Sequence, residues 1–260
     1  MTGTTRVIKI GGRPQSDPTL APRIAKLWNE APGALVVVHG GGDEVTTLQK
    51  ALGVKSRFDG GRRITSAEDI EIVRMALSGS ANKRLVSALV SHGLKALGIS
   101  GEDAGLFTAV PVDPSRLGYV GAPHRTNVQL LWHLLDGGFV PVVSPVSRNA
   151  CAGASGDSSL GDAVALNVNG DDAAAAMAIA LGASELLLVI DVPGVMSDGM
   201  AIPRLQRSTA RDLMESGVAA GGMRAKLEAA LSALDGGVER VRIGDLSAID
   251  DPTCGTLLVD

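Results

Sequence analysis

The sequence predicts an α/β fold, a three-layer sandwich in which helices cover both faces of a mainly parallel central sheet. Short aliphatic runs alternate with segments of helical periodicity along nearly the whole chain. Several of these runs are continuously apolar, as expected for strands that are covered on both faces. Together the two patterns imply βαβ crossovers in a doubly wound sheet.

The expected strands are the aliphatic runs. They cover residues 6–10, 34–38, 96–100, 140–144, 186–190 and 238–243. The first helix follows from apolar residues at helical spacing, namely Leu20, Ile24, Leu27 and Trp28.

Two further helices are predicted from signals at their ends. Thr65-x-x-Glu68 and Thr126-x-x-Gln129 have the spacing of capping boxes and therefore mark helix starts. The second of these helices is expected to end at Gly137, in a left-handed conformation that glycine adopts without strain.

Two segments lack either periodicity. Residues 106–125 contain three prolines and two glycines and predict a hairpin or a loop excursion. Residues 147–165 are small and polar and predict a mobile loop or a β-excursion. No linker is long enough to separate two domains, so residues 1–260 are expected to fold as a single domain.

Composition fits a globular enzyme and argues against other classes of protein. The chain has 260 residues, a formal net charge of -4 and 2% aromatic residues, so it lacks the basic surface and stacking platforms of nucleic-acid binders. The apolar run 173–183 is too short to span a bilayer, and the first residues do not have the pattern of a signal peptide. We therefore expect a cytoplasmic protein with no membrane or nucleic-acid partner, in which Cys151 and Cys254 are reduced.

The first motif is Lys9-Ile10-Gly11-Gly12, at the end of the first expected strand. Adjacent glycines let the backbone approach a ligand closely and present N–H groups to anionic oxygens. Lys9 adds a compact positive charge, which phosphoryl transfer needs. The alternative is a flexible turn beside a solvated lysine.

The second motif, His39-Gly40-Gly41-Gly42, directly follows the expected strand 34–38. Three glycines ahead of a helical stretch predict an anion-binding site at a helix N-terminus, on the edge of the sheet where ligands bind. The alternative is an irregular turn in which His39 is a structural hydrogen-bonding residue. Neither glycine motif matches a P-loop or a dinucleotide-binding fingerprint.

The third motif, Asn167-Val168-Asn169-Gly170-Asp171, precedes an expected helix over 172–181. Alternate residues of an extended segment face one side, so two amides and a carboxylate predict a polar substrate site in which Asp171 orients nearby lysines. The alternative is a helix N-cap at Asp171 or Asp172.

The fourth motif, Asp191-Val192-Pro193-Gly194-Val195, is a turn after the expected strand 186–190. A turn at the carboxyl end of a strand suits a nucleotide site. The sequence is equally compatible with a turn that has no ligand.

The fifth motif, Gly221-Gly222-Met223-Arg224-Ala225-Lys226, opens the last long helix. Lys226 falls in the first turns, where its ammonium and the positive end of the helix dipole act together on an anion. The alternative is a loosely capped helix with a solvent-facing lysine.

Taken in order, these five motifs and the segment around Arg63 resemble the amino acid kinase family. They are most similar to its acetylglutamate kinase branch, and the resemblance runs from about residue 6 to residue 259. It implies the carbamate kinase-like fold of that family. The N-terminal lobe, about 1–165, is then expected to bind the acyl amino acid and form the dimer, and the C-terminal lobe, about 166–260, to bind ATP.

The resemblance also implies residue roles. Lys9 and Lys226 match the lysines that stabilise the transferring phosphoryl group, and Asp171 matches the carboxylate that organises them. The positions that match substrate-binding residues are Gly41, Gly42, Arg63, Asn167 and Asn169, with Arg63 on the α-carboxylate. The positions that match nucleotide-binding residues are Gly11, Gly12, Asp191, Gly194, Val195, Met196, Val218, Ala219, Ala220 and Gly222.

The reaction that the resemblance implies is phosphorylation of the γ-carboxylate of N-acetyl-L-glutamate by ATP, a step of arginine biosynthesis. Mg²⁺ is expected to arrive with the nucleotide, without a metal site on the protein. The attacking carboxylate is already ionised at neutral pH, so no general base is needed. Catalysis then depends on positioning and on positive charge around the phosphoryl group.

The sequence departs from the family pattern at several points. Arg62 replaces an apolar residue and is expected to add a charge near the α-carboxylate site, and Gly170 replaces an alanine. Residues 147–165 form a longer segment than in the family, and the segment after Ile243 is shorter. The chain starts almost at its first strand, without the extra helix that builds a hexamer in arginine-inhibited relatives, so a homodimer without arginine feedback is expected.

Two other functions remain open at this point. A related kinase acts on an amino acid carried by a small acidic protein, and a basic rim of Arg57, Arg62, Arg63 and Arg125 suits such a carrier. A non-catalytic ligand-binding protein of the same fold is expected to have lost Lys9, Lys226 or Asp171, yet all three are present.

Overall fold

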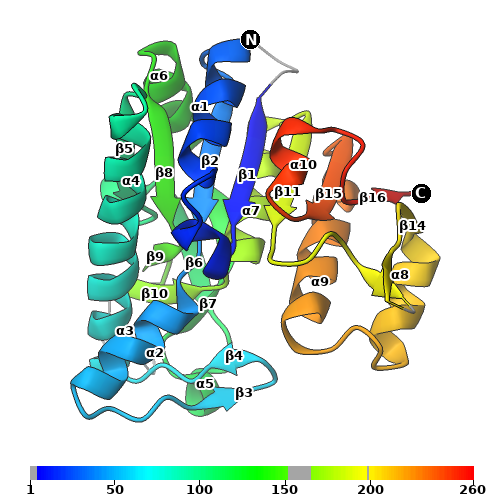
Figure 1. Cartoon of the computed structure of the whole chain (residues 1–260). Coiled ribbons are helices and arrows are strands. Elements are labelled where there is room, and N and C mark those ends of the chain that lie inside the picture. Colours follow the sequence, from blue (N-terminus) through cyan, green and yellow to red (C-terminus); the bar gives the residue numbers. More distant parts are fainter. Residues whose placement is uncertain (1–4, 152–164, 198) are drawn as a thin grey trace.

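An eight-stranded sheet forms the centre of the molecule (Figure 1). The computed structural model describes residues 5–151, 165–197 and 199–260. Neighbouring strands are parallel except for β15 and β16, which confirms the mainly parallel sheet. In order across the sheet, the strands are β14 (Arg204–Gln206), β16 (Thr256–Val259), β15 (Arg240–Gly244), β11 (Glu185–Val189), β1 (Arg6–Ile10), β2 (Leu35–His39), β8 (Val140–Ser144) and β5 (Ala96–Ser100).

Helices cover both faces of the sheet and complete the three layers (Figure 1). On one face, α1 (Leu20–Glu30) contacts α4 (Asn82–Ser91) and α10 (Ser247–Asp250). On the other, α7 (Gly170–Leu181) contacts α6 (Val128–Asp136) and α9 (Gly221–Asp235), and α9 also contacts α8 (Arg207–Glu215). Among the described residues, we find no helix with the length and apolar character needed to cross a membrane.

The apolar pattern of the sequence explains this burial. Every residue of β2, β8 and β11 is buried, as their continuous aliphatic runs predict. The stripe predicted for the first helix is buried as well, because Leu20, Ile24, Leu27 and Trp28 all face the core. Strands β1, β5 and β8 have the predicted bounds, whereas β2, β11 and β15 differ by one or two residues.

A small closed barrel lies at the carboxyl ends of β1, β2 and β8 (Figure 1). Its strands are β6 (Phe107–Pro111), β7 (Val120–Thr126), β9 (Val146–Asn149) and β10 (Ala165–Val168). β6 and β7 are antiparallel and joined through α5 (Pro114–Leu117), which confirms the predicted hairpin. For the segment 147–165, β9 and β10 confirm the predicted β-excursion at the two ends. Residues 152–164, between them, lie outside the described residues.

Both predicted capping boxes are wrong. The first lies one residue later, where Ser66 Oγ accepts from the Asp69 N–H at 3.1 Å and Asp69 Oδ2 accepts from the Ser66 N–H at 2.9 Å. Thr65 lies one residue before this cap, and its Oγ1 accepts a hydrogen bond from Asn167 Nδ2 at 3.1 Å instead of one from the helix. This box starts α3 (Ala67–Arg74), which continues through a π-helical turn, Met75–Ala81, into α4.

At the second box, the residue predicted to be the cap belongs to a strand instead. Thr126 is the last residue of β7, and α6 is preceded by Asn127, whose side chain makes no capping hydrogen bond. The predicted left-handed end is also displaced, because Gly137 has a φ of -75° and Gly138 has a φ of 74°.

Candidate active site

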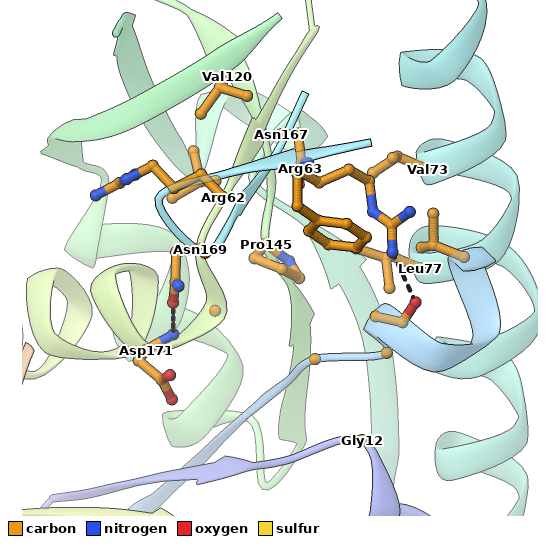
Figure 2. A pocket seen from close by; sticks show the side chains of 18 of the residues that line it. Gly12, Arg62, Arg63, Val73, Leu77, Val120, Pro145, Asn167, Asn169 and Asp171 are labelled. Atoms are coloured by element: carbon orange, nitrogen blue, oxygen red, sulfur yellow. Dashed lines mark hydrogen bonds between the residues drawn. The ribbon is translucent and has the colours of Figure 1, made fainter. Parts of the chain in front are cut away.

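Two cavities meet at the carboxyl ends of β1 and β2, and Gly12 and Gly42 line both. We call them the inner and the outer cavity. The inner cavity, about 240 Å³, is lined by Lys9, Gly40, Gly41, Phe58, Arg62, Arg63, Val73, Leu77, Val120, Pro145, Asn167, Asn169 and Asp171, among others (Figure 2). The outer cavity, about 420 Å³, is lined by Gly11, Gly12, Arg13, Pro14, Gly42, Asp43, Ile190, Asp191, Gly222 and Lys226.

Three charged side chains lie where the cavities meet. Lys9 Nζ, at the end of β1, lies 2.7 Å from Asp171 Oδ1, in the first turn of α7. Lys226 Nζ, from α9, donates to Asp171 Oδ2 at 3.1 Å. Lys9 is only 6% exposed, so the alternative of a solvated lysine is wrong. A methyl group at position 170 would lie 3.3 Å from Lys9 Cε, so Gly170 leaves room for the lysine stem.

In this cluster, burial and the opposite charge of the ion-pair partner shift each pKa in opposite directions. Burial lowers the pKa of Lys9 below its usual value, and the nearby Lys226 ammonium adds to this, while Asp171 counteracts both. Burial alone would raise the pKa of Asp171, but the two lysines outweigh it and hold that pKa below its usual range. Asp171 therefore stays ionised at neutral pH and holds the two ammonium groups at the junction.

Asn169 fixes the start of α7. Its Oδ1 accepts from the N–H group of Asp171 at 2.7 Å (Figure 2) and from that of Asp172 at 3.4 Å. The N-cap alternative at Asp171 or Asp172 is therefore wrong, since Asn169 is the N-cap. This cap directs the Asp171 carboxylate toward the lysines and leaves the Asn169 amide group at the inner cavity.

The glycine loop after β2 requires glycine at position 41. Gly41 has a φ of 152°, and a Cβ there would lie 2.7 Å from the Leu77 side chain. The loop leads into α2 (Gly42–Ala51), whose first N–H groups have no acceptor within the helix. Donors for an anion are therefore available at Gly42, where the two cavities meet.

The two glycines after β1 differ from each other. The Gly11 N–H donates to the Val189 carbonyl at 2.9 Å, so the prediction that it is presented to a ligand is wrong. A Cβ at Gly11 would also lie 3.0 Å from that carbonyl, which makes close packing its structural role. Gly12 has open space around it and lines both cavities.

His39 is a buried structural residue, as one of the two alternatives predicted. Its Nδ1–H donates to the Gly40 carbonyl at 2.8 Å, and its Nε2 accepts from Asn82 Nδ2 at 3.0 Å. Desolvation lowers the pKa of His39 to about 4, so the ring is neutral in the folded protein. His39 thereby ties the glycine loop to α4.

Gln15 connects the two glycine loops, a contact that sequence reasoning missed. Its Nε2 donates to the Gly11 carbonyl at 3.1 Å and to the Gly40 carbonyl at 3.0 Å. Gln15 belongs to the short 3-10 helix Arg13–Ser16, and no local pattern marks a glutamine that reaches a loop 25 residues away.

Arg63 lies in a dense polar network. Its guanidinium donates to the Gly42 carbonyl at 2.9 Å and to Thr46 Oγ1 at 2.8 Å, and also to Gln49 and Ser56. The group is also 4.7 Å from the centre of the Phe58 ring. The network, which sequence reasoning missed apart from Arg63, fixes the arginine against the wall of the inner cavity.

Arg62 and Arg63 point to opposite sides of the small hairpin formed by β3 (Phe58–Asp59) and β4 (Arg62–Arg63) (Figure 2). Arg62 Nη2 lies 3.4 Å from Asp172 Oδ2. Burial raises the pKa of Asp172, while Arg62 opposes that rise. The extra charge expected near Arg63 is therefore directed away from it, toward a carboxylate.

The remaining predicted residues lie in several places, some along the two cavities and some outside their lining. Asn167 lines the inner cavity, with its Nδ2 donating to Thr65 Oγ1 at 3.1 Å. Asp191 and Gly222 line the outer cavity, whereas Ala219 and Ala220 line a neighbouring hollow that also includes Gly222. Gly194, Val195, Met196 and Val218 lie outside the lining of the inner and outer cavities, and Val195 donates its N–H to Thr256 Oγ1 at 2.8 Å.

The described residues contain no group of three or more His, Cys, Asp or Glu side chains placed to hold a metal ion. A cluster of two lysines and one carboxylate suits anionic oxygens better than a cation. This donor set fits Mg²⁺ that is bound mainly by the phosphates of a nucleotide, because Mg²⁺ commonly uses few protein ligands.

The comparisons with known proteins agree with this geometry. The model of the amino acid kinase family matches residues 4–245. An acetylglutamate kinase from Geobacillus thermodenitrificans is 41% identical over 242 residues, which cover 92% of this chain and 89% of the relative. The crystal structure of smu.665 from Streptococcus mutans has a TM-score of 0.84 and 28% identity and covers 98% of both chains. A carbamate kinase from Giardia lamblia, at 16% identity and a TM-score of 0.70, with 99% of this chain and 98% of the other covered, shares the fold.

Proposed function

The chain belongs to the amino acid kinase family, and we propose that it transfers the γ-phosphoryl group of ATP to the γ-carboxylate of N-acetyl-L-glutamate. The product is N-acetyl-L-glutamyl 5-phosphate, an intermediate of arginine biosynthesis. The name shared by relatives about 40% identical over most of the chain supports this substrate.

The observation that carries the proposal is the Lys9–Asp171–Lys226 cluster at the junction of two cavities. A phosphoryl group that passes from one cavity to the other has to pass these two ammonium groups. Their positive charge offsets the charge on the transferring group, and Asp171 keeps both in place. We therefore assign Lys9 and Lys226 as catalytic residues and Asp171 as the residue that organises them.

The inner cavity takes the acceptor in this assignment. Its glycine loop supplies N–H donors at Gly41 and Gly42, and Asn167 and Asn169 supply amide groups. Arg63 is the cation that faces the substrate α-carboxylate, held in place by its network. Because the acceptor carboxylate is ionised at neutral pH, the chain has no proton to remove; it positions the two reactants and supplies positive charge to the transferring group.

The outer cavity takes the phosphates of ATP. Gly12, Gly222 and Lys226 line it, and Asp191 lies at its edge. Mg²⁺ bound to the nucleotide supplies further positive charge to the phosphates. The assignment of the adenosine to the residues around Met196 and Val218 remains part of the proposal.

We also propose a cytoplasmic homodimer. Strand β5 is at the edge of the central sheet. Exposed large apolar residues lie on β5 itself, on α4 and α6, and directly before β8, namely Leu97, Val90, Trp132 and Phe139. An unpaired strand edge beside exposed apolar residues suits a second copy of the chain.

The carrier-linked alternative has less support from the geometry. Of the four arginines expected to form a basic rim, Arg63 is buried in its own network and Arg62 is paired with Asp172. Arg63 is thus placed to face a small acceptor inside the cavity and not the surface of a carrier protein, which is left with Arg57 and Arg125 as the exposed cations of the expected rim.

The test is a coupled assay of ADP release with ATP and Mg²⁺. We expect rapid turnover of N-acetyl-L-glutamate and little or none of glutamate, N-acetyl-aspartate and aspartate. Equal turnover of free glutamate would reject the acylated substrate. Silence on all four acceptors would reject the proposal and favour the carrier-linked substrate.

A further inference from the structure

Arg13 lines the outer cavity and has no part in the mechanism above. It directly follows Gly11 and Gly12 and opens the short 3-10 helix Arg13–Ser16. Its side chain is 76% exposed, and its Nη1 donates to Asp191 Oδ2 at 2.5 Å. Both partners of this ion pair therefore lie at the place where the proposed function puts the nucleotide phosphates.

The backbone beneath Arg13 is fixed although its side chain is exposed. Pro14 is buried, and the side chain of Gln15 is bonded to the Gly11 and Gly40 carbonyls. The Asp17 N–H also donates to the Pro14 carbonyl at 3.2 Å. The turn consequently holds the start of the Arg13 side chain at the cavity while the guanidinium can change partner.

The charges that line the outer cavity indicate that the other partner of the Arg13 guanidinium is a phosphate group. Lys226 and Arg13 contribute two positive charges, and Asp43 and Asp191 contribute two negative charges. An exposed Arg–Asp pair contributes little to stability, since solvent screens it. A guanidinium binds phosphate oxygens through two parallel hydrogen bonds, as it binds a carboxylate, so a phosphate chain in the cavity can compete with Asp191 for Arg13.

We propose that Arg13 binds the phosphate chain of the nucleotide, giving up or sharing its contact with Asp191. It then adds a third cationic contact, supplied by the same chain, to those of Lys9 and Lys226. The inference rests on the proposed function only in placing a nucleoside polyphosphate in the outer cavity, and it does not depend on which acceptor is used. Arg13 also neutralises Asp191 when no nucleotide is bound.

The experiment measures nucleotide binding by calorimetry, with Mg²⁺ and without an acceptor, for the full chain and for Arg13→Ala and Arg13→Lys. The probes are AMP, ADP and a non-hydrolysable ATP analogue. Loss of a charged hydrogen-bonding group predicts roughly tenfold or greater weakening of ADP and of the analogue in Arg13→Ala. AMP is expected to bind almost unchanged, and Arg13→Lys to recover part of the loss.

Arg23→Ala is the matched control. Arg23, on α1, forms a partly exposed ion pair with Asp250 of α10, and it lines neither cavity. All three probes are expected to bind this variant as they bind the unchanged chain.

Two results would overturn the inference. Unchanged binding of ADP and of the analogue in Arg13→Ala would show that Arg13 does not reach the phosphates. Equal weakening of the binding of AMP, ADP and the analogue would show that the substitution changes the shape of the site and does not remove a contact with the phosphate chain. Failure of the proposed acceptor can be told apart from failure of this inference. If binding of ADP and of the analogue requires Arg13 but N-acetyl-L-glutamate is not turned over, the acceptor is rejected and the role of Arg13 stands.

Discussion

Lys9 Nζ and Asp171 Oδ1 lie 2.7 Å apart, and the two side chains are 7% and 4% exposed. A buried lysine and a buried carboxylate are each unfavourable alone, so each depends on the other and on Lys226. The pair joins the end of β1 to the start of α7, which are 162 positions apart in the chain. This contact is the basis of the first prediction.

Lys9→Ala or Lys226→Ala is expected to lower turnover by about two to three powers of ten, because each removes one cation from the transferring phosphoryl group. Circular dichroism checks that each variant is folded. Lys26→Ala, which removes an exposed lysine of α1, is the control and is expected to keep full activity. Normal turnover in a folded Lys9 or Lys226 variant would remove that lysine from the mechanism.

Arg63→Lys is expected to raise the KM for the acceptor about tenfold or more while the KM for ATP changes little, because lysine keeps the charge but loses the planar fork. Arg62→Lys, one residue away, is the matched variant. Since Arg62 is directed toward Asp172, its effect on the acceptor KM is expected to be much smaller. A larger effect at Arg62 than at Arg63 would reverse the assignment of the α-carboxylate.

The buried His39 predicts a pH dependence of stability. Its pKa is about 4 in the folded protein and 6.5 when unperturbed, so the unfolded chain binds the extra proton first as pH falls. The contribution of His39 is therefore fully present above about pH 6.5 and is lost as pH falls toward 4. The loss reaches about 3 kcal/mol in the free energy of unfolding.

Urea unfolding at pH 7 and pH 5 measures this dependence. His39→Gln removes the titrating ring, so the difference in unfolding free energy between the two pH values is expected to shrink. Replacement of the solvent-facing His92 is the control and should leave that difference as it is in the unchanged chain. An unchanged slope in His39→Gln would mean that His39 is not the group responsible.

Gln15→Leu is expected to lower kcat and raise both KM values, because the two glycine loops that it joins flank both cavities. Loss of two hydrogen bonds also predicts destabilisation of about 1–3 kcal/mol. Steady-state kinetics with each substrate varied in turn separates the two effects. A variant that loses stability yet keeps all its kinetic constants would limit Gln15 to a structural role.

The proposed dimer predicts a particle of twice the chain mass of 26.5 kDa in light scattering. Trp132→Glu puts a charge among the exposed apolar residues beside β5 and is expected to shift the particle toward the monomer. Leu52→Glu, at an exposed apolar position just after α2, is the control and should leave the mass unchanged. A monomeric unchanged chain would reject the dimer.

Local sequence patterns were sufficient for much of the fold. The aliphatic runs of β1, β5 and β8 predicted those strands to the residue, because covered strands need apolar side chains on both faces. The capping boxes failed for a different reason. Thr65 and Thr126 have the right spacing, but Thr65 Oγ1 accepts from Asn167 and Thr126 pairs with Phe107 as the last residue of β7.

The residues of the candidate site also separate into those that local patterns predicted and those that they did not. Lys9, Asp171, Lys226 and the glycine loop after β2 were identifiable because each lies in a short motif whose chemistry is local. The sequence by itself therefore determined the α/β class, six of the eight strands of the central sheet and the charged and glycine residues of the site. Only the tertiary structure decided the partners, such as Gln15 across the two loops, Asn169 as the cap of α7 and Arg62 on Asp172. The reason is that local patterns of apolar residues and glycines indicate which segments are buried strands and which are loops. A hydrogen-bond partner from a distant segment depends instead on which elements the fold places side by side.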